Sequence, residues 1–341
     1  MEGMKLTAYD RQVYEQELAD FLPDTLIDVH THVWEEGTLR DGEEENRACV
    51  RWPLMVAPFC TIEDLRSSYE CMFPGKRVSP LLMGYPTAVL EKTNAYALES
   101  AKRFSLPVLY CTRYDTPADV LRQAMKQGFC GIKPYQNNSP SYIPEREIRI
   151  SDFLPREHLE VMDELSGVVM LHISRPARLK DPVNLAQLME IEEKYPRLRL
   201  IVAHIGRAYA PEDLGEAFEL LRKTKNMVFD FSANTLDEAM IACVRAVGPE
   251  RLLFGSDMPI TKMRMFRVTE NGVYYNVVPR GLYGDVSEDF HMRETENADR
   301  ITLFMYEELR AFRRCAERLG LSRENIRDIF YGNAARVLNR G

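Results

Sequence analysis

The sequence lacks the features that mark membrane, secreted and disulfide-rich proteins. It has no apolar stretch near the roughly 18–20 residues that a membrane-spanning helix needs. Its N-terminus shows no basic segment followed by an apolar run, so we expect no signal peptide. The seven cysteines are scattered and form no CxxC pair, which fits reduced thiols better than disulfides or a zinc knuckle. We therefore expect a soluble, cytoplasmic protein.

An excess of positive charge is also missing. Lys and Arg number 44 against 52 Asp and Glu, which gives a formal net charge of −8. Nucleic acids and anionic membranes are bound by basic surfaces. We therefore expect neither of them as the main partner.

No glycine-rich GxGxxG loop follows the first predicted strand, which leaves a nucleotide-binding open sheet with little support. Short apolar runs alternate instead with segments of helical periodicity. Eight such alternations predict parallel βαβ units, and strands that are apolar throughout suit a sheet covered on both faces. An α/β fold of the (β/α)8 TIM-barrel type is our first prediction, and a doubly wound open sheet is the second. The predicted strands are at 26–32, 81–86, 106–112, 129–133, 168–173, 198–204, 227–231 and 251–256.

Three segments depart from this alternation. A lead-in helix is predicted at about 8–22, before the first strand. Long insertions follow the first strand, at 35–77, and the eighth, at 258–300; the first is acidic and the second is rich in Arg and Tyr. Both insertions are expected at the C-terminal face of the barrel, where loops build active sites. We assign residues 1–341 to one domain.

Histidine is scarce, with six residues in the chain, yet four of them end predicted strands. His30 and His32 close the first strand and point to the same side of it, because strand side chains alternate. His172 and His204 close the fifth and sixth strands, and Asp257 follows the eighth. Each histidine alone is typical of a hydrogen-bonded structural residue. Their joint placement at one barrel mouth favours a metal site, since imidazole nitrogen and carboxylate oxygen are zinc ligands.

Several motifs carry a resemblance to a known family. They are HTH at 30–32, LHIS at 171–174, AHIGR at 203–207, GSDMP at 255–259 and IRDIFYGNAARVL at 326–338. This set resembles the amidohydrolase superfamily, and most closely its amidohydrolase-2, or amidohydrolase-related, branch. The resemblance runs from residue 26 to residue 338.

The resemblance implies a distorted TIM barrel with a mononuclear metal centre. By this likeness His30, His32, His172 and Asp257 would bind one divalent ion, most simply Zn²⁺, with Mn²⁺ and other ions as alternatives. His204 would be the acid/base or polarising residue, while in some members the aspartate corresponding to Asp257 shuttles the proton. A homodimer is also favoured by the resemblance.

Basic residues at other strand ends suggest what the site binds. Arg113, Arg175 and Arg207 follow strand ends, and a guanidinium matches a carboxylate or a phosphate. They indicate a small anionic substrate, although each arginine alone is as consistent with pairing to a nearby acid. Lys133, at the end of the fourth strand, is interpreted first as a substrate contact and second as a carbamylated ligand bridging two metals. Asp230, on the seventh strand, is assigned a structural role.

These observations favour a metal-dependent hydrolase of a small anionic non-peptide substrate, an amide or a lactone-type ester. The alternative is a metal-dependent, non-oxidative decarboxylase of an aromatic or muconate-like acid. A non-catalytic binding protein is a third hypothesis, which predicts that part of the five-residue constellation would be missing.

Overall fold

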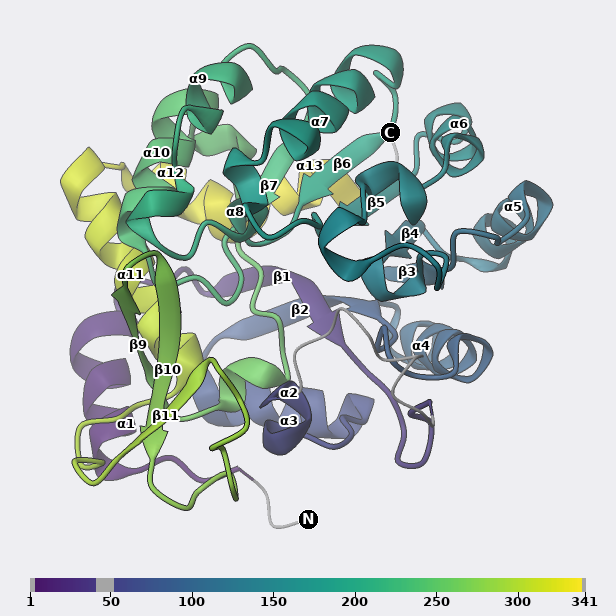
Figure 1. Cartoon of the computed structure of the whole chain (residues 1–341). Helices are drawn as coiled ribbons and strands as arrows, with labels where there is room; N and C mark the ends of the chain where they lie inside the picture. The colour runs from purple at the N-terminus through teal and green to yellow at the C-terminus, as the bar shows by residue number, and fades with distance from the viewer. Residues whose placement is uncertain (1–3, 41–51, 339–341) are drawn as a thin grey trace.

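The computed structural model describes residues 4–40 and 52–338. Eight parallel strands lie side by side in chain order, from β1 to β8, with helices between them (Figure 1). This arrangement confirms the predicted (β/α)8 barrel, and each predicted strand is present. The strands are β1 Thr25–His32, β2 Arg77–Met83, β3 Val108–Thr112, β4 Gly131–Pro134, β5 Val168–Leu171, β6 Arg199–Val202, β7 Val228–Asp230 and β8 Leu252–Leu253.

The barrel closes between its last and first strands. β8 is only two residues long, but the chain beyond it continues along β1. The N–H of Val29 donates to the carbonyl of Phe254 over 3.1 Å, and the N–H of His32 donates to the carbonyl of Met258 over 2.8 Å. The N–H of Asp257 donates in turn to the carbonyl of His30, also over 2.8 Å. This seam sets Asp257 beside the two histidines of β1.

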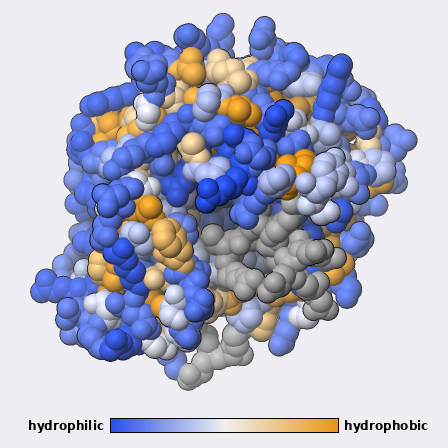
Figure 2. Space-filling view, in the orientation of Figure 1, coloured by the Kyte–Doolittle hydropathy of each residue, from blue (hydrophilic) through white to orange (hydrophobic). Residues whose placement is uncertain are grey.

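Apolar residues on both faces of the strands explain why the strands are apolar throughout. Along β5, Val168 and Met170 belong to the core inside the barrel, while Val169 and Leu171 pack in the layer between strands and helices. A strand buried on both faces needs no polar alternation. The outer surface is different: the face seen in the space-filling view is mostly hydrophilic, as a chain with 28% charged residues leads us to expect (Figure 2).

Helices follow the strands and cover the barrel, and local sequence signals mark their ends. In α7, the Asp181 carboxylate accepts the N–H of Val183 over 2.9 Å, and Pro182 fills the first helical position. An N-cap acid followed by proline is a strong helix start. The covering helices are α4 Leu90–Phe104, α5 Ala118–Gln127, α6 Arg156–Glu164, α7 Pro182–Lys194, α9 Ala217–Leu221, α10 Asp237–Val247 and α11 Phe304–Leu319.

The first and last helices of the described residues pack against the barrel. The predicted lead-in helix at about 8–22 is observed as α1 Ala8–Val13 and a π-helical turn, Tyr14–Leu18. At the other end, α12 Arg323–Arg327 and α13 Asn333–Leu338 flank another π-helical turn. The side-chain amide of Asn333 donates to the carbonyls of Pro249 and Leu252 over 2.8 and 2.7 Å, which ties α13 to the start of β8.

Within the insertion after β1, the described part forms α2 Trp52–Val56 and α3 Ile62–Met72. The Thr61 hydroxyl accepts the backbone N–H of Asp64, and the Asp64 carboxylate accepts the backbone N–H of Thr61. This capping box is a typical sequence signal for the start of a helix. Residues 41–51, which include four acidic residues of this insertion, lie outside the described residues.

The insertion after β8 forms a small three-stranded sheet in the order β11-β10-β9, beside α1 and α11 (Figure 1). Its strands are β9 Phe266–Glu270, β10 Val273–Pro279 and β11 Met292–Thr295. Its apolar residues Val278 and Met292 share a core cluster with Trp52 of α2 and Phe304 of α11. The sheet therefore joins the two insertions. Among the described residues, no helix combines the length and apolar character needed to span a membrane.

Candidate metal centre

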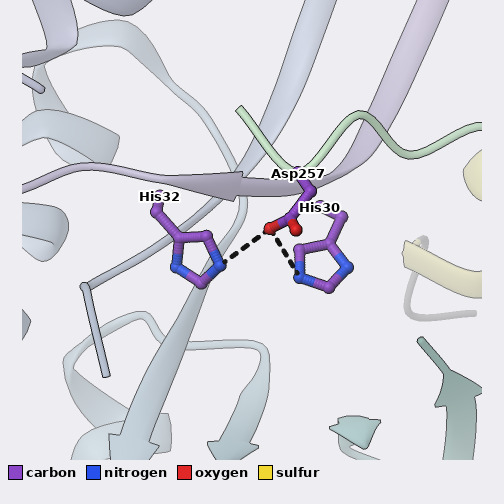
Figure 3. Close-up of side chains that lie close together, drawn as sticks. All are labelled: His30, His32 and Asp257. Atoms are coloured by element: carbon purple, nitrogen blue, oxygen red, sulfur yellow. Dashed lines mark ion pairs between the residues drawn. The ribbon is translucent and has the colours of Figure 1, made fainter. Parts of the chain in front are cut away.

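Three side chains converge where β1 and β8 meet. The Nε2 atoms of His30 and His32 lie 3.5 and 3.4 Å from one oxygen, Oδ1 of Asp257 (Figure 3). One ligand atom from each residue lies within 4.8 Å of the other two. Two imidazole nitrogens and a carboxylate oxygen form a donor set that zinc and similar divalent ions accept.

Hydrogen bonds on the far side of each imidazole fix its orientation. Nδ1 of His32 lies 2.9 Å from the carbonyl oxygen of Gly84, which can only accept a hydrogen bond. Nδ1 of His30 lies 3.1 Å from Oδ2 of Asp230. Both Nδ1 atoms therefore act as donors, which leaves the Nε2 lone pairs directed at Asp257. Metal-ligating histidines in proteins are held in the same way.

Asp230 organises several of these groups at once. Its Oδ1 accepts the backbone N–H groups of His204 and Ser232, over 2.9 and 3.0 Å, as well as the Ser232 hydroxyl. Burial alone would raise the pKa of Asp230, but its interaction with the His30 ring and these hydrogen bonds lower it to about 2. One ligand atom each of Asp230, His30 and His204 also lies within 4.8 Å of the others, so these three residues could hold an ion as well. Because the Asp230 oxygens are already engaged, we assign Asp230 to supporting the histidines.

His204 lies directly after β6 and faces the same point. Its Nδ1 is 2.8 Å from the carbonyl oxygen of Ser232 and therefore donates, while its Nε2 lies 4.0 Å from Oδ2 of Asp257. Its ring centroid is 4.8 Å from that of His30. In the neutral ring, Nε2 thus presents a lone pair to the centre of the site.

His172 follows β5 on the other side of His204, with 5.1 Å between the two ring centroids. It is not part of the close group formed by His30, His32 and Asp257. Its Nδ1 is buried and has no hydrogen-bond partner in the described part of the chain. An imidazole nitrogen that is buried without a partner fits a ligand for an added ion.

The protonation states of these groups suit a cation. Burial lowers the pKa of His204 to about 4, and burial together with the charge of Arg207 lowers the pKa of His172 well below its usual value. Burial would raise the pKa of Asp257, but His30, His32 and His204 lower it on balance. The imidazoles of His204 and His172 are therefore neutral and the Asp257 carboxylate is ionised near neutral pH, as metal binding requires.

These residues lie at one side of a cavity of about 100 Å³ at the barrel mouth. Aromatic rings supply much of the remaining wall, and Arg207 and Arg267 supply positive charge. The lining residues are His30, His32, Trp52, Pro53, Tyr85, Pro86, Thr87, Tyr135, Gln136, His172, His204, Arg207, Tyr209, Ala233, Asp257, Ile260, Arg267 and Tyr274.

Of the three predicted arginines, the structure brings only Arg207 to this cavity. Arg113 pairs with Asp115 on the outside, where its side chain is 48% exposed. Nε of Arg175 lies 3.0 Å from both carboxylate oxygens of Asp181. Arg175 lines a larger outer cavity of about 860 Å³, which shares Arg207 and Gln136 with the inner one. Local acids thus hold Arg113 and Arg175 away from the metal ligands.

Lys133 is buried close to the site but is not among the residues that line the cavity. Its Nζ has no hydrogen-bond partner in the described residues and lies 5.5 Å from the centre of the Tyr135 ring. Burial lowers the pKa of Lys133 to about 8, despite the opposing charges of Asp257 and Asp230. The Lys133 amine therefore has no hydrogen-bond partner among the described residues. It is not part of the cavity wall, however, where a substrate contact would be expected.

Sequence reasoning missed Arg267, Trp52, Tyr209 and Tyr274 as parts of this cavity. The Arg- and Tyr-rich composition of the second insertion is the signal for two of them, although it does not say which arginine turns inward. Trp52 lies within the first insertion, far from a predicted strand end, and Tyr209 lies two residues beyond Arg207, where tyrosine gives no sign of a charge-binding role.

Comparison with known proteins places the chain in a family. The amidohydrolase-2 family model, described as Amidohydrolase, matches residues 27–340. The chain belongs to this amidohydrolase family, as the strand-end motifs predicted. No curated protein matches the sequence.

Solved structures support the same fold at low sequence identity. An amidohydrolase from Burkholderia multivorans with bound zinc has a TM-score of 0.60 and 14% identity, over 92% of this chain and 99% of that chain. A probable 2-pyrone-4,6-dicarboxylic acid hydrolase from Acinetobacter baumannii has a TM-score of 0.55 and 15% identity, over 92% and 98%. A dihydroxybenzoic acid decarboxylase from a Polaromonas species, with bound manganese and an inhibitor, has a TM-score of 0.55 and 16% identity, over 94% and 98%.

Proposed function

We propose that the protein is a metal-dependent hydrolase of a small anionic non-peptide substrate, an amide or a lactone-type ester. The observation that carries this proposal is the group His30, His32 and Asp257, which presents three ligand atoms at one side of the cavity at the barrel mouth. His172 is proposed as the fourth ligand because its buried Nδ1 lacks a partner among the described residues. Zinc is the first choice of ion, and manganese is the alternative.

If these residues held a divalent ion, it would supply Lewis acidity, which would polarise a carbonyl group and make water a better nucleophile at neutral pH. The protein residues then move the protons. Nε2 of His204, which carries a lone pair, and Oδ2 of Asp257 lie 4.0 Å apart and face the same point. We propose that Asp257 takes the proton of the attacking water and passes it to the leaving group.

Two groups orient the substrate and the developing charge. The proton taken by Asp257 would pass to Nε2 of His204, which would then donate to the oxyanion until the leaving group takes this proton. Arg207 lines the same cavity and would bind the anionic group of the substrate. Tyr85, Tyr135 and Tyr274 line the cavity, and their flat rings would favour a flat substrate.

A non-oxidative decarboxylase is the second candidate. The aromatic, arginine-containing cavity suits an aromatic carboxylic acid as well as a lactone. A solved structure named as a dihydroxybenzoic acid decarboxylase has the same fold. In this alternative the same residues would bind the acid, and CO2 would leave without consumption of water.

The test uses protein loaded with Zn²⁺ or Mn²⁺ and a panel of lactones, amides and aromatic carboxylic acids. A hydrolase releases acid on a lactone in a pH-stat, whereas a decarboxylase releases CO2 from an acid. We expect chelation to abolish turnover, and His204→Asn and Asp257→Asn to lower kcat by roughly 10²–10⁴. Turnover that survives chelation, or that is unchanged in both variants, would contradict the proposal.

A further inference from the structure

We infer that Arg267, carried into the cavity by β9 of the second insertion, acts beside Arg207 as a second arginine that selects substrates bearing a carboxylate group. This inference rests on the proposed function, because it names the chemical class recognised by the same cavity. It also gives the insertion a role, since Arg267 of β9 and Tyr274 of β10 line the same cavity as the residues at the ends of the barrel strands.

The Arg267 side chain is held in one position from several sides. Its guanidinium carbon lies 4.5 Å from the ring centre of Tyr274, 5.0 Å from that of Tyr209 and 4.7 Å from that of Phe304. Nη1 donates to the carbonyl of Ala233 over 2.8 Å, and Nε donates to Oδ1 of Asn276 over 3.0 Å. Nη2 has no acceptor in the described part of the chain. A guanidinium fixed in this way loses little entropy when it binds a ligand.

The charge of Arg267 is not neutralised by a nearby acid. Among the described residues, no carboxylate oxygen lies within 4.0 Å of its guanidinium nitrogens. Glu308 is close in the fold, but its Oε2 accepts the N–H of Ala233 over 2.6 Å. Burial raises the pKa of Glu308 well above its usual value, so this carboxyl offers little negative charge. An uncompensated cation inside a cavity favours an anionic ligand.

Arg178 provides a contrast within the same structure. Its guanidinium carbon lies 5.4 and 5.3 Å from the ring centres of the same two residues, Tyr209 and Tyr274. However, its Nη1 is 2.5 Å from Oδ2 of Asp213, and it lines the outer cavity. Tyr209 and Tyr274 therefore contact two arginines. Arg178 is neutralised by Asp213, whereas Arg267 lines the inner cavity and has no partner acid among the described residues.

Two further donors in this cavity also lack acceptors. The indole N–H of Trp52 and the hydroxyl of Thr87 are buried and have no hydrogen-bond partner among the described residues. Both residues line the inner cavity with Arg267. Buried donors are nearly always satisfied, so their acceptor is expected to come from a ligand. A carboxylate offers several lone pairs, and its planar shape matches the guanidinium fork.

The inner cavity has room for the acid group of a small ligand. Its volume is about 100 Å³, and it shares Arg207 and Gln136 with the outer cavity of about 860 Å³, so the rest of a ligand can extend outwards. Benzoate is a suitable probe, and benzamide is a neutral control of nearly the same shape. Binding of both is measured by calorimetry on protein freed of metal with a chelator, so that no turnover or metal coordination contributes.

We expect wild-type protein to bind benzoate more tightly than benzamide. In Arg267→Met, benzoate affinity should fall roughly tenfold to hundredfold, as for a lost charge-assisted hydrogen bond, while benzamide affinity stays within about twofold. Arg178→Met is the matched control and should keep the wild-type ratio. If Arg267→Met does not fold, Arg267→Lys keeps the charge without the fork and should lose part of the preference.

Three results would overturn the inference: no binding of benzoate by the wild type, an unchanged ratio in folded Arg267 variants, or an equal loss in Arg178→Met. Inorganic phosphate that binds through Arg267 more tightly than benzoate would overturn the carboxylate class. The outcome is separable from that of the proposed function. A protein that shows the Arg267-dependent preference but no hydrolysis would refute the hydrolase proposal alone.

Discussion

At the scale of single residues, the site depends on how Asp230 distributes its hydrogen bonds. Its two oxygens accept from three different residues, His30, His204 and Ser232, and the side chain is fully buried. All of these partners act as donors. A ligand histidine whose Nδ1–H meets a carboxylate binds metal more tightly, because the proton is held away from Nε2.

This arrangement predicts the effect of Asp230→Asn. The amide NH2 of asparagine would face a donor on one side or the other, because every partner of Asp230 donates. We expect metal affinity to fall about tenfold to hundredfold, measured by competition with a chromogenic chelator. Ser67→Ala, at an exposed hydroxyl in α3, is the control. An affinity equal to the wild-type value in a folded variant would refute the supporting role of Asp230.

Residue identities were predictable where strand ends determine them. His30, His32, His172, His204 and Asp257 meet because parallel strands of one barrel end on the same face. The direction of a long side chain beyond a strand end depends on local acids, which the strand pattern does not show. The three predicted arginines show this most clearly. Arg113 pairs with Asp115 and Arg175 pairs with Asp181, so both lie outside the inner cavity. Of the three, Arg207 alone lines it.

At the scale of elements, the turn after β6 has an unusual backbone. Four consecutive residues, His204 to Arg207, have φ values of 57°, 49°, 62° and 62°. Left-handed conformations cost roughly 1–2 kcal/mol for each residue that has a Cβ atom. The turn nevertheless aims both His204 and Arg207 at the cavity. Strain of this kind is found mainly where surrounding contacts hold a functional geometry.

The turn makes Gly206→Ala a sharp test. A Cβ atom at this position would lie 2.6 Å from Cδ1 of Leu179, in addition to the left-handed φ. We expect a loss of about 2–4 kcal/mol in the free energy of unfolding, measured with urea. Gly320→Ala is the matched control, because Gly320 has the same φ of 62° and no atom within 4 Å of the added Cβ. Its expected loss is about 1 kcal/mol; equal losses would contradict the packing argument.

Elements were predictable where burial leaves a strong pattern. The eight barrel strands are buried on both faces, and the segments between them have helical periodicity. The sheet of β9, β10 and β11 was not predicted. Only β10 has a clear alternation of buried and half-buried residues, and the pairing partner β11 lies a dozen residues further along the chain. Such pairing depends on the tertiary contacts with Trp52 and Phe304.

At the scale of the whole molecule, the buried histidines make the fold sensitive to acid. Burial lowers the pKa of His204 to about 4, and burial also lowers the pKa values of His30 and His172. The unfolded chain binds these protons near pH 6.5. The stability that the neutral rings contribute is therefore present above pH 6.5 and is lost as the pH falls towards 4.

We expect metal-free protein to lose roughly 3 kcal/mol of stability through His204 between about pH 7 and 4. Urea unfolding at a series of pH values measures this loss. In His204→Gln the slope over the same range should be smaller, since glutamine does not titrate. Identical slopes in the two proteins would show that His204 does not carry the effect.

The central claim is that His30, His32 and Asp257 form a metal centre, and metal content tests it most directly. Protein purified without chelator and supplied with Zn²⁺ is desalted, and metal per chain is measured by mass spectrometry. We predict about one ion per chain, lost in His30→Ala and Asp257→Ala and retained in His158→Gln, a histidine of α6 outside the site. No bound metal in the wild type, or the same content in all four proteins, would contradict the account.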